Sequence, residues 1–409
     1  MNTVVGIIAE YNPFHNGHRY QIEQIRQRVE NAAIVTVMSG NFTQRGEPAI
    51  LDKFTRAELA VNGGCDLVLE LPFTSAVRSA QDFARGGIDL LKNLNIVDIL
   101  AFGAEMDDIE LLKQVADRMN ASDFKSTLHS KLNTGISYAN AICQTLSKLT
   151  SIPEKILRLP NVMLAVEYLR ALESTNIKPL LIPRVSAGHN DKVLHSDISS
   201  ASAIRASIYS KNPAWSEISK TVDSKTLNAL RTADLPIMED LFKPLLTKIV
   251  CSSASELRKI YGMNEGLENK LIQAAHTAQS IDEFIDFAVS RRYTRTRIQR
   301  LLLHLLTGLM EEQVKNFDAT HYARILAFNQ RGRELIKELK KSAQMPIITK
   351  ITRHITSRVI YEQSHILEVY QRKLSLDIIS SDIFSIIRRD IELGQDFTTS
   401  PKYCPDIPA

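Results

Sequence analysis

The chain has 409 residues, of which 44% are hydrophobic and 23% charged, with a formal net charge of +4. This ordinary globular composition excludes a mainly disordered chain or a coiled-coil rod, and the length allows more than one domain. No apolar run reaches the roughly 18–20 residues that cross a bilayer, and Met1–Gly6 lacks the basic region of a signal peptide. The four cysteines lie far apart without a CxxC pair, which is typical of a reducing compartment. We therefore expect a cytoplasmic protein with no membrane partner and no protein-bound metal cluster.

The N-terminal part alternates short β-branched apolar runs with helical patterns. The first run is Val4–Ala9, and others follow at 33–38, 66–71, 97–102 and 179–183. Helices are predicted over about 17–30 and 54–62, the second closed by Gly63-Gly64. This alternation predicts an α/β fold with a Rossmann-like, doubly wound parallel sheet. Residues 107–174 read as a mostly helical insertion before the last strand.

Strand patterns fade beyond about residue 233, and residues 241–345 have helical periodicity. The Pro-containing segment 234–244 is the best boundary, so we predict one domain over 1–235 and a mainly helical domain over 236–409. Lys and Arg number 25 against 27 Asp and Glu in residues 1–240, but 25 against 19 in residues 241–409. The C-terminal part is therefore the half to suspect of binding a polyanion.

A polar turn directly follows the first predicted strand and contains Asn12, Pro13, His15, Gly17 and His18. In open α/β sheets ligands bind at the carboxyl ends of the strands, where the first N–H groups of the next helix are free to bind an anion. Two histidines three residues apart can donate to phosphate oxygens, and a glycine between them permits close approach. The alternative is that they only cap the helix or form half of a metal site. P-loop and GxGxxG patterns are absent.

The His-x-Gly-His string resembles the HxGH signature of the nucleotidyltransferase and class-I aminoacyl-tRNA synthetase (HUP) superfamily. The longer string Glu10-Tyr11-Asn12-Pro13-Phe14-His15-Asn16-Gly17-His18 resembles the bacterial tRNA(Met) cytidine acetate ligase family. Further blocks resemble that family in the same order and span most of the chain: 37–49, 66–73, 102–105, 159–161, 167–169, 198–205, 264–269 and 292–297.

The resemblance implies that ATP activates acetate as acetyl-adenylate, and that the acetyl group passes to N4 of the wobble cytidine of elongator tRNA(Met). It implies ATP with Mg²⁺, and no use of acetyl-CoA. It also implies an ATP site with His15 and His18 as the catalytic pair. The implied ATP-binding residues are Ile7, Ile8, Ala9, Glu10, Tyr11, Asn12, Pro13, Phe14, His15, Asn16, Gly17, His18, Arg19, Tyr20, Gly103, Asn161, Arg184, Ser199, Ser200 and Arg205.

Each of the later positions also has a plain structural interpretation. Gly103 could belong to a tight turn, Asn161 could be a helix N-cap, Arg184 could be a surface charge, and Ser199-Ser200 could be a capping run. Lys53 and Arg56 could reach substrate, but solvated charges are the preferred interpretation for both.

The sequence departs from the family pattern at two places. Pro160-Asn161-Val162-Met163-Leu164-Ala165 stands where the family has Pro-Asn-Asn-Ile-Leu-Gly, and Gly188-His189-Asn190-Asp191 stands where it has Tyr-His-Asp. Both changes are expected near the nucleotide or acetate pocket.

Five arginines lie within residues 291–300, with no acidic residue from 288 to 310. A basic run with an interleaved aromatic suits phosphate contacts and base stacking, so we predict tRNA binding there. A solvated helix face is the alternative. The predicted contacts are Arg291, Arg292, Arg295, Arg297 and Arg300.

Two other functions remain open from the sequence. One is an adenylyltransferase that acts on a small metabolite, against which the basic C-terminal part argues. The other is a non-catalytic RNA-binding protein, against which the intact HxGH string argues.

Overall fold

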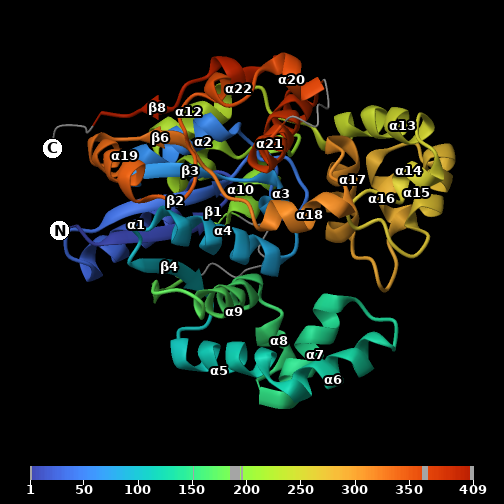
Figure 1. Ribbon diagram of the computed structural model, residues 1–409, viewed down its shortest axis with the longest axis horizontal. Helices are drawn as coiled ribbons and strands as arrows, with labels where there is room; N and C mark the ends of the chain where they lie inside the picture. Colours follow the sequence, from blue (N-terminus) through green and yellow to red (C-terminus); the bar gives the residue numbers. More distant parts are fainter. Residues whose placement is uncertain (1, 151, 185–193, 195–196, 362–366, 406–409) are drawn as a thin grey trace.

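The protein is an α/β structure built on a single twisted sheet, seen here in a computed structural model (Figure 1). The structure describes residues 2–150, 152–184, 194, 197–361, 367–405. In this part of the chain the strands are β1 (Val4–Ala9), β2 (Ala33–Ser39), β3 (Leu67–Leu71), β4 (Ile99–Ala104), β5 (Lys178–Pro183), β6 (Ala323–Phe328), β7 (Ile347–Ile348) and β8 (Lys402–Tyr403). Their order is β5-β4-β1-β2-β3-β6-β7, and β8 pairs with β6.

Strands β1 to β5 are parallel to one another, as the sequence predicts. The helices up to β5 are α1 (Asn16–Arg28), α2 (Lys53–Asn62), α3 (Phe73–Ala76), α4 (Ala80–Leu94), α5 (Ile109–Asn120), α6 (Ser122–Leu132), α7 (Tyr138–Thr150), α8 (Glu154–Leu157) and α9 (Pro160–Leu172). Helices α5 to α9 form the predicted insertion, and α5 to α8 project below the sheet in the view of Figure 1.

The remaining helices follow β5. They are α10 (Ala201–Ile208), α11 (Trp215–Thr221), α12 (Ser224–Thr232), α13 (Phe242–Val250), α14 (Ala254–Leu257), α15 (Leu267–Thr277), α16 (Ile281–Ala288), α17 (Arg295–Thr307), α18 (Glu311–Asp318), α19 (Gln330–Ser342), α20 (Ser357–Tyr361), α21 (Val369–Ile386) and α22 (Gln395–Thr398).

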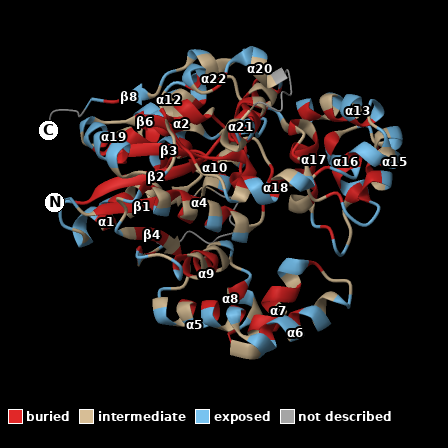
Figure 2. Ribbon diagram, viewed as in Figure 1, coloured by how far each residue is buried: buried red, intermediate tan, exposed pale blue. Residues whose placement is uncertain are grey.

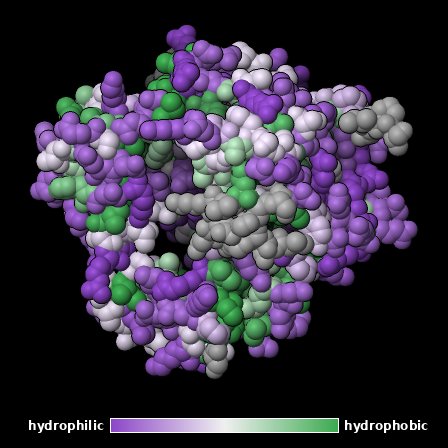
Figure 3. Space-filling model, turned by 180° about the vertical axis from the view of Figure 1, so that it is seen from behind, coloured by the Kyte–Doolittle hydropathy of each residue, from purple (hydrophilic) through white to green (hydrophobic). Residues whose placement is uncertain are grey.

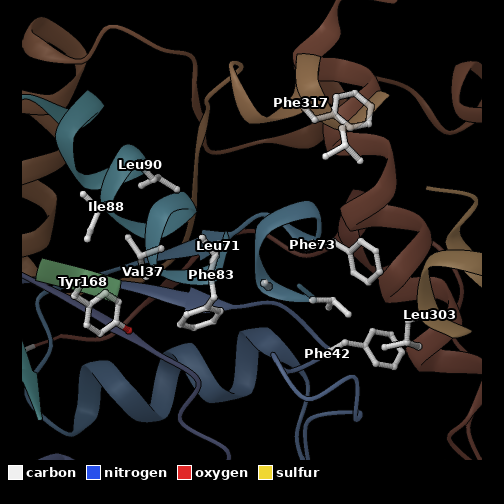
Figure 4. Close-up of a cluster of buried hydrophobic side chains, with 14 of the residues drawn as sticks. Val37, Phe42, Leu71, Phe73, Phe83, Ile88, Leu90, Tyr168, Leu303 and Phe317 are labelled. Atoms are coloured by element: carbon white, nitrogen blue, oxygen red, sulfur yellow. The ribbon is translucent and has the colours of Figure 1, made fainter. Parts of the chain in front are cut away.

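Both faces of the sheet are buried, which is what a doubly wound sheet requires (Figure 2). Along β2, Val35 and Val37 face one apolar cluster, while Ile34 and Met38 face the opposite one. The first cluster also includes side chains of α4, α9 and the helical region α13–α17, and Figure 4 shows part of it. The second includes side chains of α1, α2 and α10–α12. This alternation has the period of two that a strand imposes on its side chains.

The sheet continues into the part of the chain that we expected to form a separate helical domain over 236–409. Strand β6 pairs antiparallel with β3, with Glu70 opposite Arg324. This strand is hard to predict from the sequence, because it is only six residues long and its second residue is Arg324. Apart from β6, β7 and β8, the expectation of a mainly helical C-terminal part is confirmed.

Four charged side chains join β3 and β6 to α2 and α22 inside the protein. Lys53 Nζ lies 2.8 Å from Glu70 and 3.0 Å from Asp396, and Arg324 lies 2.9 Å from each of the same two carboxylates. All four side chains are at most 3% exposed. The expectation that Lys53 is solvated is therefore wrong, because its charge is neutralised by residues distant in sequence. Arg56 is also fully buried.

No helix in the described ranges is both long and apolar enough to cross a membrane. The face shown in Figure 3 is mostly hydrophilic, with hydrophobic side chains in small separate patches.

Candidate active site

A cavity of about 730 Å³ opens at the carboxyl ends of β1, β4 and β5, within the range of about 300–1,000 Å³ that is usual for small-molecule sites. It is bounded by the start of α1, the start of α9 and the start of α10. The predicted ATP-binding residues that line it are Ile8, Ala9, Glu10, Tyr11, Asn12, His15, Gly17, His18, Tyr20, Gly103, Asn161, Arg184, Ser199, Ser200 and Arg205. The structure thus brings together segments that are nearly 200 residues apart in sequence.

The other predicted residues of the segment 7–20 do not line this cavity. Ile7 and Phe14 are core residues, each 1% exposed, and Pro13 is buried. Asn16 donates to the carbonyl oxygens of Asp197 and Lys220, and Arg19 forms an ion pair with Asp223 at 2.8 Å. These residues hold the turn and the helix in place.

His15 and His18 form the N-terminal cap of α1. Gly17 N donates to His15 Nδ1 at 3.0 Å, and His15 N donates to His18 Nδ1 at 3.2 Å. The two rings stack with centroids 3.7 Å apart. Because each Nδ1 accepts a hydrogen bond, each neutral ring carries its proton on Nε2. The site therefore holds two stacked imidazoles, with planes 26° apart, whose Nε2–H groups are donors.

The surroundings keep both histidines uncharged. Burial, together with Arg184 and Arg205, lowers the pKa of His15 to about 3. Burial, the neighbouring His15 and Arg184 lower the pKa of His18 well below its ordinary value. The positive charge of the cavity comes from its arginines, and the histidines contribute directed N–H donors.

The backbone approaches closely around this cap. A Cβ at Gly17 would lie 2.9 Å from Cε1 and 3.1 Å from Nδ1 of His15, so only glycine fits. Tyr11 has φ +46°, a left-handed conformation that costs a bulky residue free energy. Its ring is 1% exposed and packs edge-on against His18, with centroids 4.8 Å apart. This packing holds the turn where β1 ends.

The start of α10 provides the opposite wall. Ser200 is the N-cap of α10 and accepts from Ala203 N at 3.1 Å, so the capping interpretation of this serine is correct. Arg205 donates to the carbonyl oxygen of Asn12 at 2.7 Å, which fixes the HxGH turn to α10. Ser199 is 2% exposed and lies beside Ser200 at the cavity.

A third wall comes from the ends of β4 and β5 and from α9. A Cβ at Gly103 would lie 3.2 Å from Cγ of Arg184, so the two residues are in contact. Asn161 is inside the first turn of α9, whose N-cap is Leu159, so the N-cap interpretation of Asn161 is wrong. Its side-chain amide donates to Glu105 Oε1 at 2.6 Å.

Of the two departures from the family pattern, only the one in α9 lies in the described part of the chain. Val162 and Ala165 are core residues of α9, 0% and 1% exposed, and neither lines the cavity. Residues 188–191 lie outside the described part of the chain.

Sequence reasoning gave Glu10 no role beyond membership of the segment 7–20. Its carboxylate Oε1 accepts from Gln44 N at 2.7 Å, and its carbonyl oxygen accepts from Arg56 Nη1 at 2.5 Å. Arg56 also donates to the carbonyl oxygens of Ser39, at 3.1 Å, and Gly40. The expectation that Arg56 is solvated is wrong, because it ties the ends of β1 and β2 together. Sequence reasoning also missed Gln44, Arg45, Glu105 and Tyr168, which line the cavity from loops and from α9.

The arginines of residues 291–300 have acidic partners that are distant in sequence. Arg292 lies 2.6 Å from Glu265, and Arg295 pairs with Asp282 and Asp286. Arg297 has no ion pair among the described residues and lies over the ring of Tyr293, with its guanidinium carbon 4.4 Å from the centroid. Arg291 is exposed.

Arg300 differs from the other four arginines. It is turned toward the loop that follows β2, where Nη1 donates to the carbonyl oxygen of Gln44 at 3.2 Å. Burial, with the nearby Arg297, lowers the pKa of Arg300 to about 10. Arg300 thus connects α17 to Gln44, which lines the cavity.

Among the described residues no group of three or more His, Cys, Asp or Glu side chains is arranged to hold a metal ion. A divalent cation at this site would have to take most of its ligands from a bound phosphate group and water, as Mg²⁺ commonly does.

Comparison with known proteins agrees with this arrangement. Residues 1–396 match the model of the HIGH Nucleotidyl Transferase family. A curated tRNA(Met) cytidine acetate ligase of Acetivibrio thermocellus is 35% identical, with 97% of this chain and 98% of that protein aligned. The protein of the same name from Caldanaerobacter subterraneus is also 35% identical, over 96% of this chain and 97% of that protein.

Solved structures of high similarity come from Thermotoga maritima TmcAL. The form bound with alpha-thio ATP superimposes with a TM-score of 0.87 at 30% identity, covering 99% of this chain and 100% of that one. The apo form gives 0.88 at 31% identity, with the same coverage.

Proposed function

The chain belongs to the family of tRNA(Met) cytidine acetate ligases, and we propose that it is an ATP-dependent enzyme that forms acetyl-adenylate from acetate and ATP and then acetylates N4 of the wobble cytidine of elongator tRNA(Met). One observation carries the ATP-binding half of this proposal. Two neutral imidazoles present Nε2–H donors at the start of α1, beside Arg184 and Arg205. A triphosphate accepts from such donors and needs the positive charge.

In the first step a carboxylate oxygen of acetate attacks the α-phosphorus of ATP, and the bond to pyrophosphate breaks. Such a reaction depends on alignment and on neutralising the charge of the departing pyrophosphate, with little covalent participation by the enzyme. His15 and His18 donate to the phosphates, Gly17 lets them approach the backbone, and Arg184 and Arg205 balance the charge. A Mg²⁺ ion bound to the phosphates of ATP would add to this neutralisation, since the described residues offer no carboxylate cluster to hold it.

In the second step the cytidine N4 attacks the acetyl carbonyl, and AMP leaves. The acetyl group comes from acetate, so acetyl-CoA is not a substrate. The tRNA lies against the arginine run, where Arg291, Arg297 and the inward-facing Arg300 form no ion pair among the described residues. We also propose that the protein acts in the cytoplasm, where its tRNA substrate is found.

The test is to incubate the protein with ATP, labelled acetate and bulk bacterial tRNA, and to digest the RNA. Labelled N4-acetylcytidine is expected. If ATP is consumed with acetate but the label never enters RNA, the tRNA half of the proposal fails, and adenylylation of a small metabolite becomes the better interpretation. Replacing labelled acetate with labelled acetyl-CoA should give no product.

Two histidine variants make the test specific to the site. His18→Ala should abolish acetate-dependent exchange of pyrophosphate into ATP while leaving tRNA binding intact. His276→Ala is the matched control, because His276 is an exposed residue of α15. Equal loss of tRNA binding and exchange in His18→Ala would contradict the division of labour between the two parts of the protein.

A further inference from the structure

One end of the cavity differs in chemistry from the phosphate end. It is lined by apolar and aromatic side chains from α4, β4, α7 and α9, among them Phe83, Phe102, Cys143, Leu164 and Tyr168. The rings of Phe102 and Tyr168 lie 5.7 Å apart, and Tyr168 and Phe83 belong to the same buried cluster (Figure 4). A triphosphate group makes no favourable contacts with apolar side chains, whereas a planar base or an acyl group can pack against them.

The hydroxyl of Tyr168 is buried at this apolar end without a hydrogen-bond partner among the described residues. The residue is 3% exposed. Leaving a buried hydroxyl without a hydrogen bond is unfavourable, so such a group in a native protein usually has a ligand or water as partner. Burial, followed by the nearby Glu10, raises the pKa of Tyr168 far above its ordinary value. The phenol therefore stays protonated and can act only as a neutral donor or acceptor.

Glu10 lines the same cavity, near enough to both Tyr168 and Arg205 for its charge to shift their pKa values. Oε1 accepts from Gln44 N, while Oε2 has no hydrogen-bond partner within the described ranges. Burial raises the pKa of Glu10, and the Gln44 N–H, Arg205, Arg56 and Arg45 oppose the rise. Because burial raises its pKa, the Glu10 carboxylate in its ionised form is a stronger proton acceptor than a solvated one, as a general base requires.

The other groups in the cavity are poorly suited to accept a proton. His15 and His18 each accept at Nδ1, and their remaining nitrogen already carries a proton. Glu105 accepts from Asn161 at 2.6 Å, and Glu47 lies 3.8 Å from Arg205 at the mouth. Glu10 is thus the carboxylate best placed to take a proton beside the apolar wall.

We propose that the apolar end of the cavity receives the amine-bearing pyrimidine of the acceptor, that Glu10 is the general base of acyl transfer, and that the Tyr168 hydroxyl donates to the carbonyl oxygen of the acyl group. The inference rests on the acetyl-transfer reaction proposed above. The exocyclic nitrogen forms a bond to the acyl carbon, and the developing oxyanion takes the Tyr168 hydrogen bond. Glu10 Oε2 takes the N–H proton, and the bond to the phosphate oxygen of AMP breaks, so that AMP leaves as its anion.

This role predicts opposite behaviour of the two half-reactions. Glu10→Gln keeps an oxygen for Gln44 N but cannot accept a proton. Acetate is an anion and approaches more easily when the nearby carboxylate is removed, so acetate-dependent pyrophosphate exchange should stay within about threefold of wild type or rise. Transfer from preformed acetyl-adenylate to tRNA should fall by about 100-fold or more, because general base catalysis contributes about 10²–10⁴-fold.

The experiment measures both half-reactions with ATP, labelled acetate and tRNA under single-turnover conditions. Glu10→Gln should accumulate labelled acetyl-adenylate that does not decay on addition of tRNA. Tyr168→Phe removes only the hydroxyl and should slow transfer by about tenfold or more, since one oxyanion donor is worth up to about 10²–10³-fold. Glu23→Gln, the same change at an exposed position of α1, should leave both half-reactions unchanged.

Three outcomes are decisive. If Glu10→Gln transfers within tenfold of the wild-type rate, Glu10 is not the base. If it loses exchange and transfer in equal measure while its thermal unfolding matches wild type, Glu10 serves adenylation and the inference is overturned. If the wild-type protein itself forms no acetyl-adenylate, the failure belongs to the proposed function.

Discussion

The guanidinium of Arg300 donates to the carbonyl oxygen of Gln44 over 3.2 Å. The N–H of the same Gln44 donates to the carboxylate of Glu10 at 2.7 Å, so one loop residue joins the arginine helix α17 to the cavity. The contact is close along the backbone too, because a Cβ at Gly46 would lie 2.5 Å from the backbone nitrogen of Arg300. The arginine run that we expect to bind RNA is thus in direct contact with a loop that lines the cavity.

We therefore expect Arg300→Met to slow acetyl transfer by about five- to tenfold, the effect of losing one hydrogen bond of about 1–1.5 kcal/mol that positions the loop. The salt dependence of tRNA binding should not change, since this side chain faces inward. Single-turnover transfer and filter binding at several salt concentrations measure the two effects. A loss of tRNA affinity with normal transfer would show that Arg300 contacts RNA directly.

Arg291 and Arg297 should behave differently from Arg292 and Arg295. The first two have no acidic partner among the described residues, whereas the others are neutralised by Glu265, Asp282 and Asp286. Replacing Arg291 or Arg297 with Gln should reduce the slope of log affinity against log salt by about one per phosphate contact. Arg295→Gln should change the slope less. Equal slopes for all four variants would place the tRNA elsewhere.

Gly17→Ala should disable the histidine cap without unfolding the protein. The new methyl group would lie 2.9 Å from His15 Cε1 and push the ring from its place. Overpacking of this kind costs about 1–3 kcal/mol, which corresponds to a loss of ATP affinity of about 5–150-fold if the whole cost falls on binding. Calorimetric titration with ATP checks this. Gly103→Ala serves as a milder comparison. Its methyl group would lie 3.2 Å from Cγ of the flexible Arg184 side chain, so its loss of ATP affinity should be smaller.

The neutral His15 makes folding depend on pH in a defined direction. Its folded pKa, about 3, lies below the ordinary 6.5, so the unfolded chain binds the extra proton between these values. The contribution of the neutral His15 to the free energy of unfolding is complete above pH 6.5. It is lost as the pH falls toward 3, by up to about 1.4 kcal/mol per pH unit. His15→Asn can retain a capping oxygen but does not titrate.

Urea unfolding of both proteins from pH 7.5 to 4.5 measures this dependence. The wild type should lose stability relative to His15→Asn as the pH falls. A difference that stays constant with pH would mean that His15 is not held neutral in the folded protein.

Asp396→Asn should be strongly destabilising. It leaves Lys53 and Arg324 to share Glu70 inside the protein, and breaking a buried ion pair costs about 3–5 kcal/mol. Asp282→Asn removes an exposed partner of Arg295 and should cost at most about 1 kcal/mol. Denaturant unfolding compares the two variants. Similar values for both would mean that water reaches the buried cluster.

The sequence predicted those features that neighbouring residues determine. The five parallel strands, the cap of α1 and the helical insertion follow from apolar runs, turn residues and spacing, and the structure confirms them. Features that depend on distant partners could not be predicted. Lys53 and Arg56 looked solvated because Asp396 and the carbonyl oxygen of Glu10 are not neighbours in sequence.

The arginine run shows the same limit. Residues 288–310 contain no acid, but the fold brings Glu265, Asp282 and Asp286, which precede this segment, next to Arg292 and Arg295. Glu10 gave no separate signal, since its position beside Gln44 and the aromatic wall arises from loops and from α9.

The antiparallel pairing of β6 with β3 bears on how the protein is made. Residues 1–235 leave the ribosome well before Ala323–Phe328 are synthesised, so during translation β3 has an open edge and Glu70 lacks Arg324. The sheet is therefore completed only after the last quarter of the chain has been synthesised. The residues that line the cavity all lie within positions 8–205, so a chain truncated before β6 would keep them but leave the β3 edge of their sheet unpaired.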